Sequence, residues 1–518
     1  MSSEPLTPLD TRPPSVVPVA LDDLAEVVGA TLVGGTGGVV TGVTLSSRDV
    51  RDGDLYAALP GMRTHGARFA ADAVASGAVA VLTDGPGADL LSEAGVDVPV
   101  LRVDDPREVL GRVAAHVYGW PAESVTTIGV TGTQGKTTSA FLMASALRAC
   151  GDRVGVIGTT GAFLEDRPVS SALTTPEAPA LHALFAVMRD HGADAVVMEV
   201  SSHALALHRV DGVVYDVAVF LNLGRDHLDF HADVEDYFAA KASLFTPEHA
   251  GHAVVDVDDP YGRRLAAETA LPVTTVSVDG REEADWRVAS LESTPSGSTA
   301  EVVGPDGQER TLVVGLPGRF NVANALAVLA AVTATGRAVD DALAGIAACT
   351  GVPGRMEPVD VGQDFVALVD YAHKPDALRA VLASLRGLGP GRLLVVVGAG
   401  GDRDPGKRPL MGAVAAELAD VVVVTDDNPR TEEPAAVRAA ILAGAQDAIL
   451  RGATATLVEI GDRRAAIAHA VADARPGDTV VVAGKGDESG QVVGDVVHRF
   501  DDREVVAEAL RDRERRDG

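Results

Sequence analysis

Apolar residues recur along the middle of this chain in runs that predict buried strands, each followed by a loop and a helical stretch. Residues 125–130 lead into the loop TGTQGKTT and then into a helix-like segment, and residues 195–200 and 217–221 are almost continuously apolar. Such runs are typical of parallel strands covered on both faces. A stretch from about 275 to 314 alternates apolar and polar residues instead, which predicts antiparallel strands.

The two ends of the chain predict further α/β domains. Short apolar runs and polar turns alternate before residue 105, and beyond residue 353 the runs LLVVVG, VVVVTD, ATLVEI and TVVVAG are separated by helical stretches. Pro106 opens a predicted helix, and the turn-rich GVPGRMEPV marks a second boundary. We therefore predict an α/β fold of three domains after a proline-rich flexible tail: the tail at 1–18 and domains at 19–105, 106–352 and 353–518.

Composition narrows the class of protein. The chain has 518 residues, of which 46% are hydrophobic, and 44 Lys and Arg against 74 Asp and Glu give a formal charge of −30. This charge disfavours binding to nucleic acid or to an anionic membrane surface. Two cysteines cannot form a disulfide framework, and no apolar run is long enough to span a membrane. We predict a soluble cytoplasmic protein without a nucleic-acid partner or membrane insertion.

The segment 131–138, TGTQGKTT, predicts a phosphate-binding loop between a strand and a helix. Glycines let backbone N–H groups surround phosphate oxygens, and the helix N-terminus favours negative charge. The alternative is a glycine-rich turn with an exposed lysine. In the phosphate-binding interpretation Lys136 reaches the β- and γ-phosphates and the Thr137 hydroxyl binds magnesium. The predicted ATP contacts are Gly132, Thr133, Gln134, Gly135, Lys136, Thr137 and Thr138.

Acidic and histidine residues follow the next two predicted strands. Glu199 ends one strand, where an acid would face the ligand crevice of a parallel sheet and a magnesium ion. It could equally cap a helix. The segment 222–231 carries His227 and His231 among several acids, which fits a metal or phosphate site but also a capped loop.

Lys241 lies on an apolar stripe of a predicted helix, one turn from Tyr237 and one turn from Phe245. A lysine in such a position usually extends to water. The alternative is a desolvated amine that adds CO₂ and binds magnesium as a carbamate.

The last domain carries two polar loops at strand ends. GAGGDRDPGKR, at 398–408, lacks a glycine that the dinucleotide fingerprint needs, because Arg403 occupies that position. DDNPR, at 426–430, places Arg430 for a two-bond contact to a carboxylate, although the segment could be only an Asn-Pro turn braced through Glu432 or Glu433.

Together these segments resemble the Mur ligase family, the ATP-dependent amide ligases of peptidoglycan precursor synthesis. The resemblance covers nearly the whole chain after the tail and also includes TTPE, MEVSSHALALHRV, AAKASLF, GRFNVANALA, GRMEPV, VDYAHKPDAL and GKGDE. It implies a UDP-binding N-terminal domain, a central ATPase domain and a Rossmann-like C-terminal domain that brings an amino acid.

The resemblance also implies site residues beyond the phosphate loop. Lys136, Glu199, His227 and carbamylated Lys241 are the implied catalytic group, and Thr137, Glu199, His227 and Lys241 the implied ligands of two Mg²⁺ ions. Asn321, Asn324 and Arg355 would contact ATP. Leu45, Ser47, Thr174, Thr175, Ser201 and Arg209 would hold the UDP substrate. The amino-acid pocket would contain Arg403, Asp427, Asn428, Pro429, Arg430, Gly484 and Glu488.

The implied reaction joins meso-2,6-diaminopimelate to the D-Glu of UDP-N-acetylmuramoyl-L-Ala-D-Glu through an acyl phosphate, with ATP as co-substrate and a monomer as the expected form. The alternatives are a ligase that adds L-lysine or glutamate and an inactive nucleotide-binding homologue. Four residues depart from the family pattern: Gln134, which stands where the phosphate loop frequently has Asn, Leu173, Leu207, and Asp487, which stands where a histidine is usual.

Overall fold

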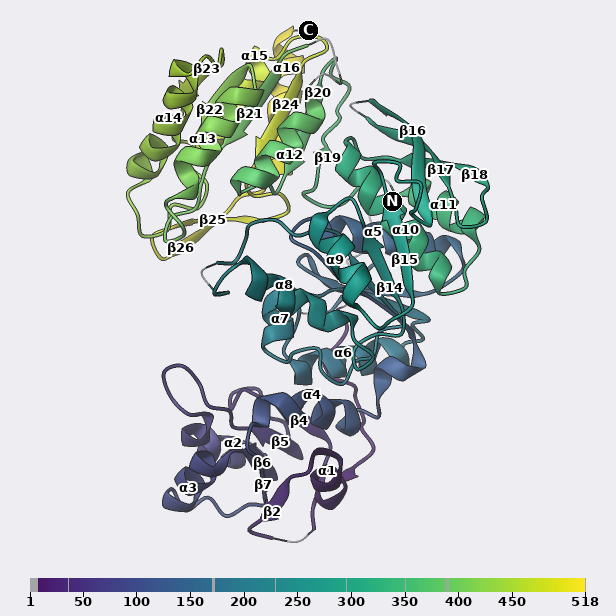
Figure 1. Ribbon diagram of the computed structural model, residues 1–518. Helices are drawn as coiled ribbons and strands as arrows, with labels where there is room; N and C mark the ends of the chain where they lie inside the picture. The colour runs from purple at the N-terminus through teal and green to yellow at the C-terminus, as the bar shows by residue number, and fades with distance from the viewer. Residues whose placement is uncertain are drawn as a thin grey trace. The chain divides into compact units, whose positions relative to one another are not determined.

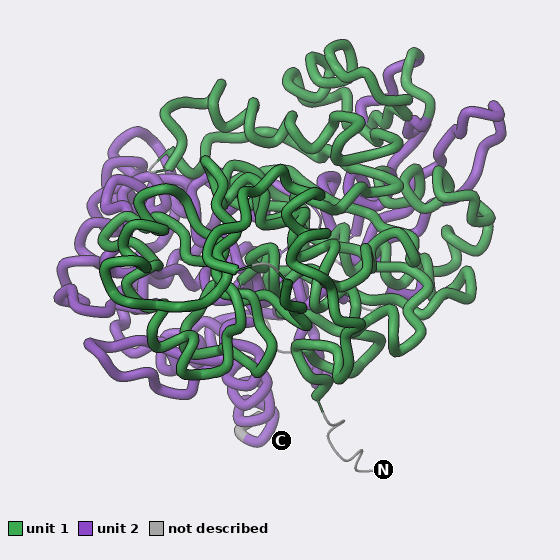
Figure 2. The backbone as a smooth tube through the Cα atoms, turned by 90° about the horizontal axis from the view of Figure 1, so that it is seen from below, with its two compact units in different colours: residues 1–277, 283–285, 327–345 green, residues 278–282, 286–326, 346–518 purple. Residues whose placement is uncertain are grey.

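The computed structural model describes residues 8–517 except 36, 170–172, 229, 295, 350, 387 and 389–390. The chain divides into two compact units, which Figure 2 distinguishes by colour. Unit 1 comprises residues 1–277, 283–285 and 327–345, and unit 2 comprises residues 278–282, 286–326 and 346–518. The predicted boundaries near residues 105 and 352 remain predictions.

The first part of unit 1 is a five-stranded sheet in the order β2-β7-β6-β5-β4, in which only β2 pairs antiparallel. Helix α4 begins after Asp105, whose carboxylate accepts the Arg107 N–H at 2.8 Å, and Pro106 fits its first turn. The elements are β1 (Val19–Ala20), α1 (Leu21–Val28), β2 (Thr31–Val33), β3 (Val39–Val40), β4 (Gly42–Thr44), β5 (Asp54–Ala57), η1 (Gly66–Phe69), α2 (Ala70–Ala75), β6 (Ala80–Thr83), α3 (Gly85–Glu93), β7 (Val100–Arg102) and α4 (Pro106–Val117).

The second part of unit 1 is built on strands in the order β11-β10-β9-β12-β8-β13-β14-β15. Strands β9, β12, β8, β13, β14 and β15 run parallel, as the apolar runs predicted for β8, β12 and β13, and β10 and β11 add antiparallel. The elements are η2 (Pro121–Ser124), β8 (Thr126–Thr131), α5 (Lys136–Ala149), β9 (Val154–Gly158), β10 (Gly161–Leu164), β11 (Arg167–Val169), α6 (Ala178–Asp190), β12 (Ala195–Glu199), α7 (Ser202–Ala206), β13 (Val217–Phe220), α8 (Val234–Ala242), η3 (Ser243–Phe245), β14 (Ala253–Asp256), α9 (Pro260–Glu268) and β15 (Val273–Ser277).

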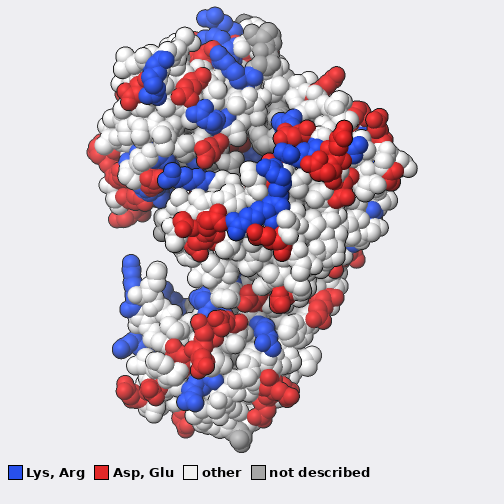
Figure 3. Space-filling model, viewed as in Figure 1, with Lys and Arg blue, Asp and Glu red and all other residues white. Residues whose placement is uncertain are grey.

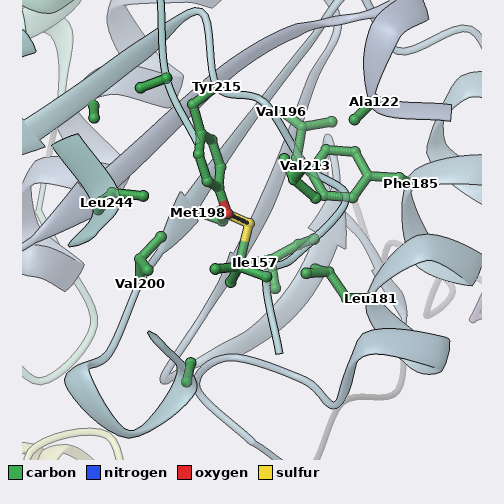
Figure 4. Packing of buried hydrophobic residues seen from close by; sticks show 14 of the residues in the cluster. Ala122, Ile157, Leu181, Phe185, Val196, Met198, Val200, Val213, Tyr215 and Leu244 are labelled. Atoms are coloured by element: carbon green, nitrogen blue, oxygen red, sulfur yellow. Dashed lines mark hydrogen bonds between the residues drawn. The ribbon is translucent and has the colours of Figure 1, made fainter. Parts of the chain in front are cut away.

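Apolar side chains fill the space between this sheet and its helices. Figure 4 shows Phe185 and Leu181 of α6 facing Val196 and Ile157 of the strands. The Tyr215 hydroxyl is buried there and donates to the Met198 sulfur at 3.0 Å. This packing fixes the strand ends from which the polar loops start.

Unit 2 contains a six-stranded sheet in the order β19-β20-β24-β21-β22-β23, parallel except for β19. Its inner strands β20, β24, β21 and β22 are buried, under α12, α13 and α14 on one side and α15 and α16 on the other (Figure 1). The elements are β19 (Glu357–Pro358), β20 (Val366–Asp370), α12 (Pro375–Leu385), β21 (Leu393–Val397), α13 (Lys407–Leu418), β22 (Val421–Val424), α14 (Pro434–Leu450), β23 (Thr456–Glu459), α15 (Arg463–Asp473), β24 (Thr479–Ala483), β25 (Gly490–Val493), β26 (Val496–Arg499) and α16 (Asp502–Asp517).

The alternating stretch is antiparallel only in its second part. β16 (Trp286–Thr294), β17 (Gly297–Val303) and β18 (Glu309–Val314) form an antiparallel meander in unit 2. The expectation that this pattern starts near 275 is wrong, because β15 pairs parallel with β14. Two helices follow the meander and contribute residues to both units: α10 (Arg319–Ala334) and α11 (Val339–Ala348).

The described part of the predicted tail makes specific contacts. The Leu9 N–H donates to the Pro168 carbonyl at 3.0 Å, and its side chain is buried against the central core. Arg12 donates to both oxygens of Asp54 at 2.9 and 2.7 Å. Residues 8–12 are therefore attached to both sheets of unit 1. The proline content alone did not reveal these contacts. Residues 1–7 lie outside the described range.

The surface and helices add two observations. On the face shown in Figure 3, acidic and basic side chains are interspersed. In the part of the chain that the structure describes, no helix combines the length and the apolar character that crossing a membrane requires.

Candidate active site

The predicted phosphate loop lies between β8 and α5, with Gly135 at the N-cap of the helix in a left-handed conformation. The Lys136 ammonium turns back over the loop and donates to the carbonyls of Gly132 at 2.7 Å and Thr133 at 3.2 Å. Asn222, after β13, holds the loop through both amide atoms, which pair with the Gln134 N–H at 3.0 Å and the Gln134 carbonyl at 3.1 Å. The side chains of Lys136 and Asn222 therefore hold the loop through its backbone N–H and carbonyl groups.

Glu199 lies beside this loop at the carboxyl end of β12 and is 1% exposed. Its carboxylate accepts from the Thr137 hydroxyl at 3.0 Å and from the N–H and hydroxyl of Thr159 at 2.8 and 3.1 Å. The structure thus brings together Thr137 and Glu199, as predicted, and adds Thr159. That residue follows β9, and its place at a parallel strand end was the signal that could have found it.

The residues predicted to hold the muramoyl-dipeptide part of the substrate lie together near Glu199: Thr174, Thr175, Ser201 and Arg209. The Thr175 hydroxyl donates to the Glu199 carbonyl at 2.8 Å and accepts the Ser201 N–H at 3.1 Å. Arg209 donates to the Thr175 carbonyl at 3.5 Å. Leu45 and Ser47 follow β4 in the other sheet of unit 1 and are half-buried.

Lys241 is buried on α8, with 1% of its surface exposed, and does not extend to water. Its Nζ donates to the Gly132 carbonyl at 3.0 Å and to the Thr131 hydroxyl at 3.4 Å, and it lies 4.7 Å from the centre of the Tyr237 ring. The Tyr237 hydroxyl in turn lies 3.1 Å from the Thr133 hydroxyl. The predicted stripe therefore faces the phosphate loop.

His227 lies at the edge of the same site in a left-handed backbone conformation. Its Nε2 is 3.3 Å from Asp226, and its ring stands edge-on to those of His203 and Tyr237. Among the described residues, no group of three His, Cys, Asp or Glu side chains is arranged to hold a metal ion. Magnesium commonly uses one or two carboxylates together with substrate phosphates and water. The Thr137 hydroxyl and the Glu199 carboxylate, 3.0 Å apart, fit such a partial site.

Helix α8 begins at Asp233, whose carboxylate accepts the Asp236 N–H at 2.8 Å. We expect Asp233→Ala to destabilise this helix by about 1 kcal/mol, because a helix N–H loses its partner. Native-state hydrogen exchange of α8 amides measures the loss. Asp233→Asn keeps an acceptor and serves as the control; equal exchange in both variants would contradict the role of the cap.

The predicted amino-acid pocket lies at the carboxyl ends of β21, β22 and β24 in unit 2. The Arg430 guanidinium donates to the Gly401 carbonyl at 2.6 Å, and no Asp or Glu among the residues the structure describes lies within ion-pair distance of it. Glu432 is instead held by Arg408, at 2.9 and 2.7 Å. The alternative that Arg430 only braces the turn through Glu432 is therefore wrong.

Two glycines allow the pocket loops to approach closely. A Cβ at Gly401 would lie 1.8 Å from the Pro429 carbonyl oxygen, and one at Gly484 would lie 2.9 Å from an Asp427 oxygen. Arg430 itself has a left-handed φ of 51°, a conformation that costs about 1–3 kcal/mol in a residue other than glycine. Its N–H donates to Val492 at 3.0 Å, which holds it there.

Acidic groups line the other side of the pocket. Asp427 and Asn428 are buried, and the Asn428 amide donates to Glu488 at 3.0 Å. Burial and the neighbouring Asp427 raise the pKa of Glu488. Arg403 is exposed and Arg430 is half-buried. The side chains of both arginines lie beside Gly400. These residues therefore offer the guanidinium groups of Arg403 and Arg430 and the carboxylates of Asp427 and Glu488.

The remaining residues predicted to contact ATP lie in unit 2. Asn321 and Asn324 are buried on α10, where the Asn321 amide donates to the Pro317 carbonyl at 2.8 Å. Arg355 lies over the Tyr371 ring at 4.2 Å and 3.8 Å from Asp487, the residue that departs from the family pattern. Of the other departures, Leu173 is 43% exposed, and the Leu207 carbonyl accepts from Arg107 at 3.2 Å.

Comparison with known proteins identifies the family. Three family models match: "Mur ligase family, catalytic domain" at residues 39–118, "Mur ligase middle domain" at 130–332 and "Mur ligase, glutamate ligase domain" at 354–486. A Streptomyces avermitilis protein is 52% identical over 499 residues, 96% of this chain and 98% of its own.

The chain belongs to the Mur ligase family.

Several relatives of this Mur ligase carry the same name. The Streptomyces avermitilis protein is named UDP-N-acetylmuramoyl-L-alanyl-D-glutamate–2,6-diaminopimelate ligase, and a Corynebacterium glutamicum protein of the same name is 49% identical over 94% of this chain and 97% of its own. A solved structure with that name is 32% identical, has a TM-score of 0.70 and covers 96% of this chain and 100% of its own. The predicted family and three-domain α/β fold are confirmed.

Proposed function

We propose that this Mur ligase joins meso-2,6-diaminopimelate to the D-Glu of UDP-N-acetylmuramoyl-L-Ala-D-Glu at the expense of ATP. The observation that carries the choice of amino acid is the Arg430 guanidinium, which has a backbone carbonyl as its partner at the end of a parallel strand. Asp427 and Glu488 stand in the same pocket. Guanidinium and carboxylate groups together suit an end group that carries both a carboxylate and an ammonium, as diaminopimelate does at its distal carbon.

Activation of the substrate is the first step. A carboxylate is a poor electrophile, so we propose that the D-Glu side-chain carboxylate attacks the γ-phosphorus of ATP, giving an acyl phosphate and ADP. Lys136 and the N–H groups at the start of α5 would stabilise the transferring phosphoryl group. Lys136 would exchange the carbonyls of Gly132 and Thr133, its present acceptors, for phosphate oxygens.

Thr137 and Glu199 would hold a magnesium ion, and His227 and a carbamylated Lys241 a second one. When bound, the metal supplies positive charge that neutralises the phosphates. Thr159 would orient Glu199, since it donates two hydrogen bonds to that carboxylate. Thr174, Thr175, Ser201 and Arg209 would orient the dipeptide carboxylate next to this group, and Leu45 and Ser47 would contact the UDP end.

The neutral amine of diaminopimelate then attacks the acyl carbon and loses a proton to water, the phosphate leaves with the bonding electron pair, and an amide remains. Both substrates must meet with water excluded, because water would hydrolyse the acyl phosphate. Asn321, Asn324 and Arg355 are proposed to contact ATP. We propose that the enzyme works in the cytoplasm, where ATP is available, and the monomer stays the expected form.

Carbamylation of Lys241 is proposed from its buried position beside the phosphate loop. We expect Lys241→Ala to lower activity by roughly 10²-fold, because a group that supports metal binding is lost. Acetate should restore part of the activity and chloride at equal ionic strength should not. ¹³C NMR under ¹³CO₂ should show a carbamate signal in the wild type that Lys241→Ala lacks; a wild type without this signal contradicts the proposal.

Phosphate release tests the proposed function. We expect release that requires ATP, UDP-N-acetylmuramoyl-L-Ala-D-Glu and meso-diaminopimelate together, with a tripeptide product of the corresponding mass. Release with another amino acid of a panel, but not with diaminopimelate, would assign a different ligase. ATP binding without release under any combination would indicate an inactive homologue.

A further inference from the structure

Lys485 follows Gly484 after β24, and its side chain is completely buried. The ammonium group donates to the Asn428 side-chain oxygen at 2.7 Å and to the Gly490 carbonyl at 2.7 Å, and it lies 3.4 Å from Asp427. An ammonium has three protons and no acceptor. Two of these protons are used in the hydrogen bonds to Asn428 and Gly490, and the Asp427 carboxylate lies within ion-pair distance of the same ammonium.

The contact to Asn428 fixes the orientation of that amide. The Asn428 side-chain oxygen accepts from two groups that can only donate, the Lys485 ammonium and the Val492 N–H at 3.0 Å. The amide nitrogen must then point the other way, where it donates to Glu488 at 3.0 Å. Lys485 thus acts on Glu488 through Asn428.

The same ammonium joins three chain segments. Gly490 and Val492 belong to the hairpin of β25 and β26, in which the Val492 carbonyl accepts the Arg430 N–H at 3.0 Å. Asn428 and Arg430 belong to the loop after β22, and Glu488 to the loop after β24. The Lys485 ammonium therefore contacts the segments that carry Glu488 and Asn428 and the hairpin that holds Arg430.

Buried charges give Lys485 an electrostatic effect as well. Its Nζ lies 3.8 Å from a Glu488 oxygen, and Asp427 and Asp487 also face that carboxylate. Burial lowers the pKa of Lys485, while Asp427 opposes this shift. Removing this cation would leave Glu488 beside two acids with the Arg463 guanidinium still interacting with it but without the charge of Lys485, and the ionised form would become less favourable.

We propose that Lys485 is a positioning residue of the amino-acid pocket, which orients Asn428 and Glu488 and anchors the hairpin behind Arg430. The inference rests on the proposed function, because it assigns Glu488 to the ammonium at the distal carbon of diaminopimelate. In this role Lys485 does not contact the amino acid itself but determines the orientation of the side chains that bind it.

Two variants test this role. Lys485→Met removes the charge and keeps an unbranched buried side chain. Asn428→Asp keeps acceptors for Lys485 and Val492 but cannot donate to Glu488. For Lys485→Met we expect the KM for meso-diaminopimelate to rise by about 10-fold to 100-fold, as expected for hydrogen bonds to charged groups, with the KM for ATP changed less than about twofold.

The pH dependence separates positioning from general loosening of the fold. Both variants should shift the acidic limb of kcat/KM for diaminopimelate upward by about one pH unit, because Glu488 then needs a higher pH to ionise. The limb for the UDP substrate should not move. Arg499→Gln, which removes an exposed cation of the same hairpin, is the control and should match the wild type.

The outcomes are distinct. A wild type without diaminopimelate-dependent phosphate release refutes the proposed function. A wild type with that activity, together with folded variants whose diaminopimelate KM and acidic limb are unchanged, overturns the role of Lys485. If Lys485→Met does not fold, Asn428→Asp decides alone, and an unshifted acidic limb in that variant overturns the proposal.

Discussion

Lys136→Ala is expected to lower the turnover of this Mur ligase by about 10³-fold while leaving the fold intact. The ammonium is placed at the start of α5, where it can meet the transferring phosphates, and the loss of one donor that stabilises the transition state costs on the order of 10²–10³ in rate. The fold should survive, because Lys136 donates to carbonyls of its own loop. Phosphate release under saturating substrates and circular dichroism give the two measurements.

Arg148→Ala is the matched control for this change. Arg148 lies on the same helix and pairs with Glu165 at the surface, where an ion pair contributes little. Its activity should stay near that of the wild type. A folded Lys136→Ala enzyme within about tenfold of wild-type turnover would mean that the loop does not carry the phosphate chemistry.

Those features of the site that depend on local pattern could be predicted from the sequence. Apolar runs located β8 and β12, and an acid at the carboxyl end of a parallel strand predicts a place in the ligand crevice for Glu199, with a helix cap as the alternative. The pairing of β12 with β8, which puts Glu199 beside the phosphate loop, is seen in the structure. The stripe on α8 likewise placed Lys241 and Tyr237 on one face.

Features that depend on contacts between distant segments could not be predicted. Arg408 pairs with Glu432, 24 residues away, and this pair decides that Glu432 does not neutralise Arg430. Lys485 stands in a glycine-rich loop, which usually predicts exposure, but the hairpin of β25 and β26 buries it. Leu9 belongs to a proline-rich segment and still enters the central core. In each case a tertiary contact overrides the local composition.

The amino-acid choice is the prediction with the largest effect. We expect the wild-type enzyme to prefer meso-diaminopimelate over L-lysine by about 10⁴-fold in kcat/KM, because a site built around a polar contact strongly rejects an analogue that lacks it. Lysine has no carboxylate at its distal carbon and would leave the Arg430 guanidinium with only its Gly401 contact. Competition between the two amino acids in the phosphate-release assay measures the ratio.

Arg430→Ala should reduce this preference because it weakens the binding of diaminopimelate. Its diaminopimelate KM should rise by about 10²-fold, since a two-bond contact between guanidinium and carboxylate is lost, while the constants for ATP and the UDP substrate change little. Arg451→Ala, which removes an exposed arginine after α14, should behave as wild type. Comparable efficiency of the wild type with lysine and diaminopimelate would refute the assignment, because a guanidinium that does not discriminate between them cannot be what selects the amino acid.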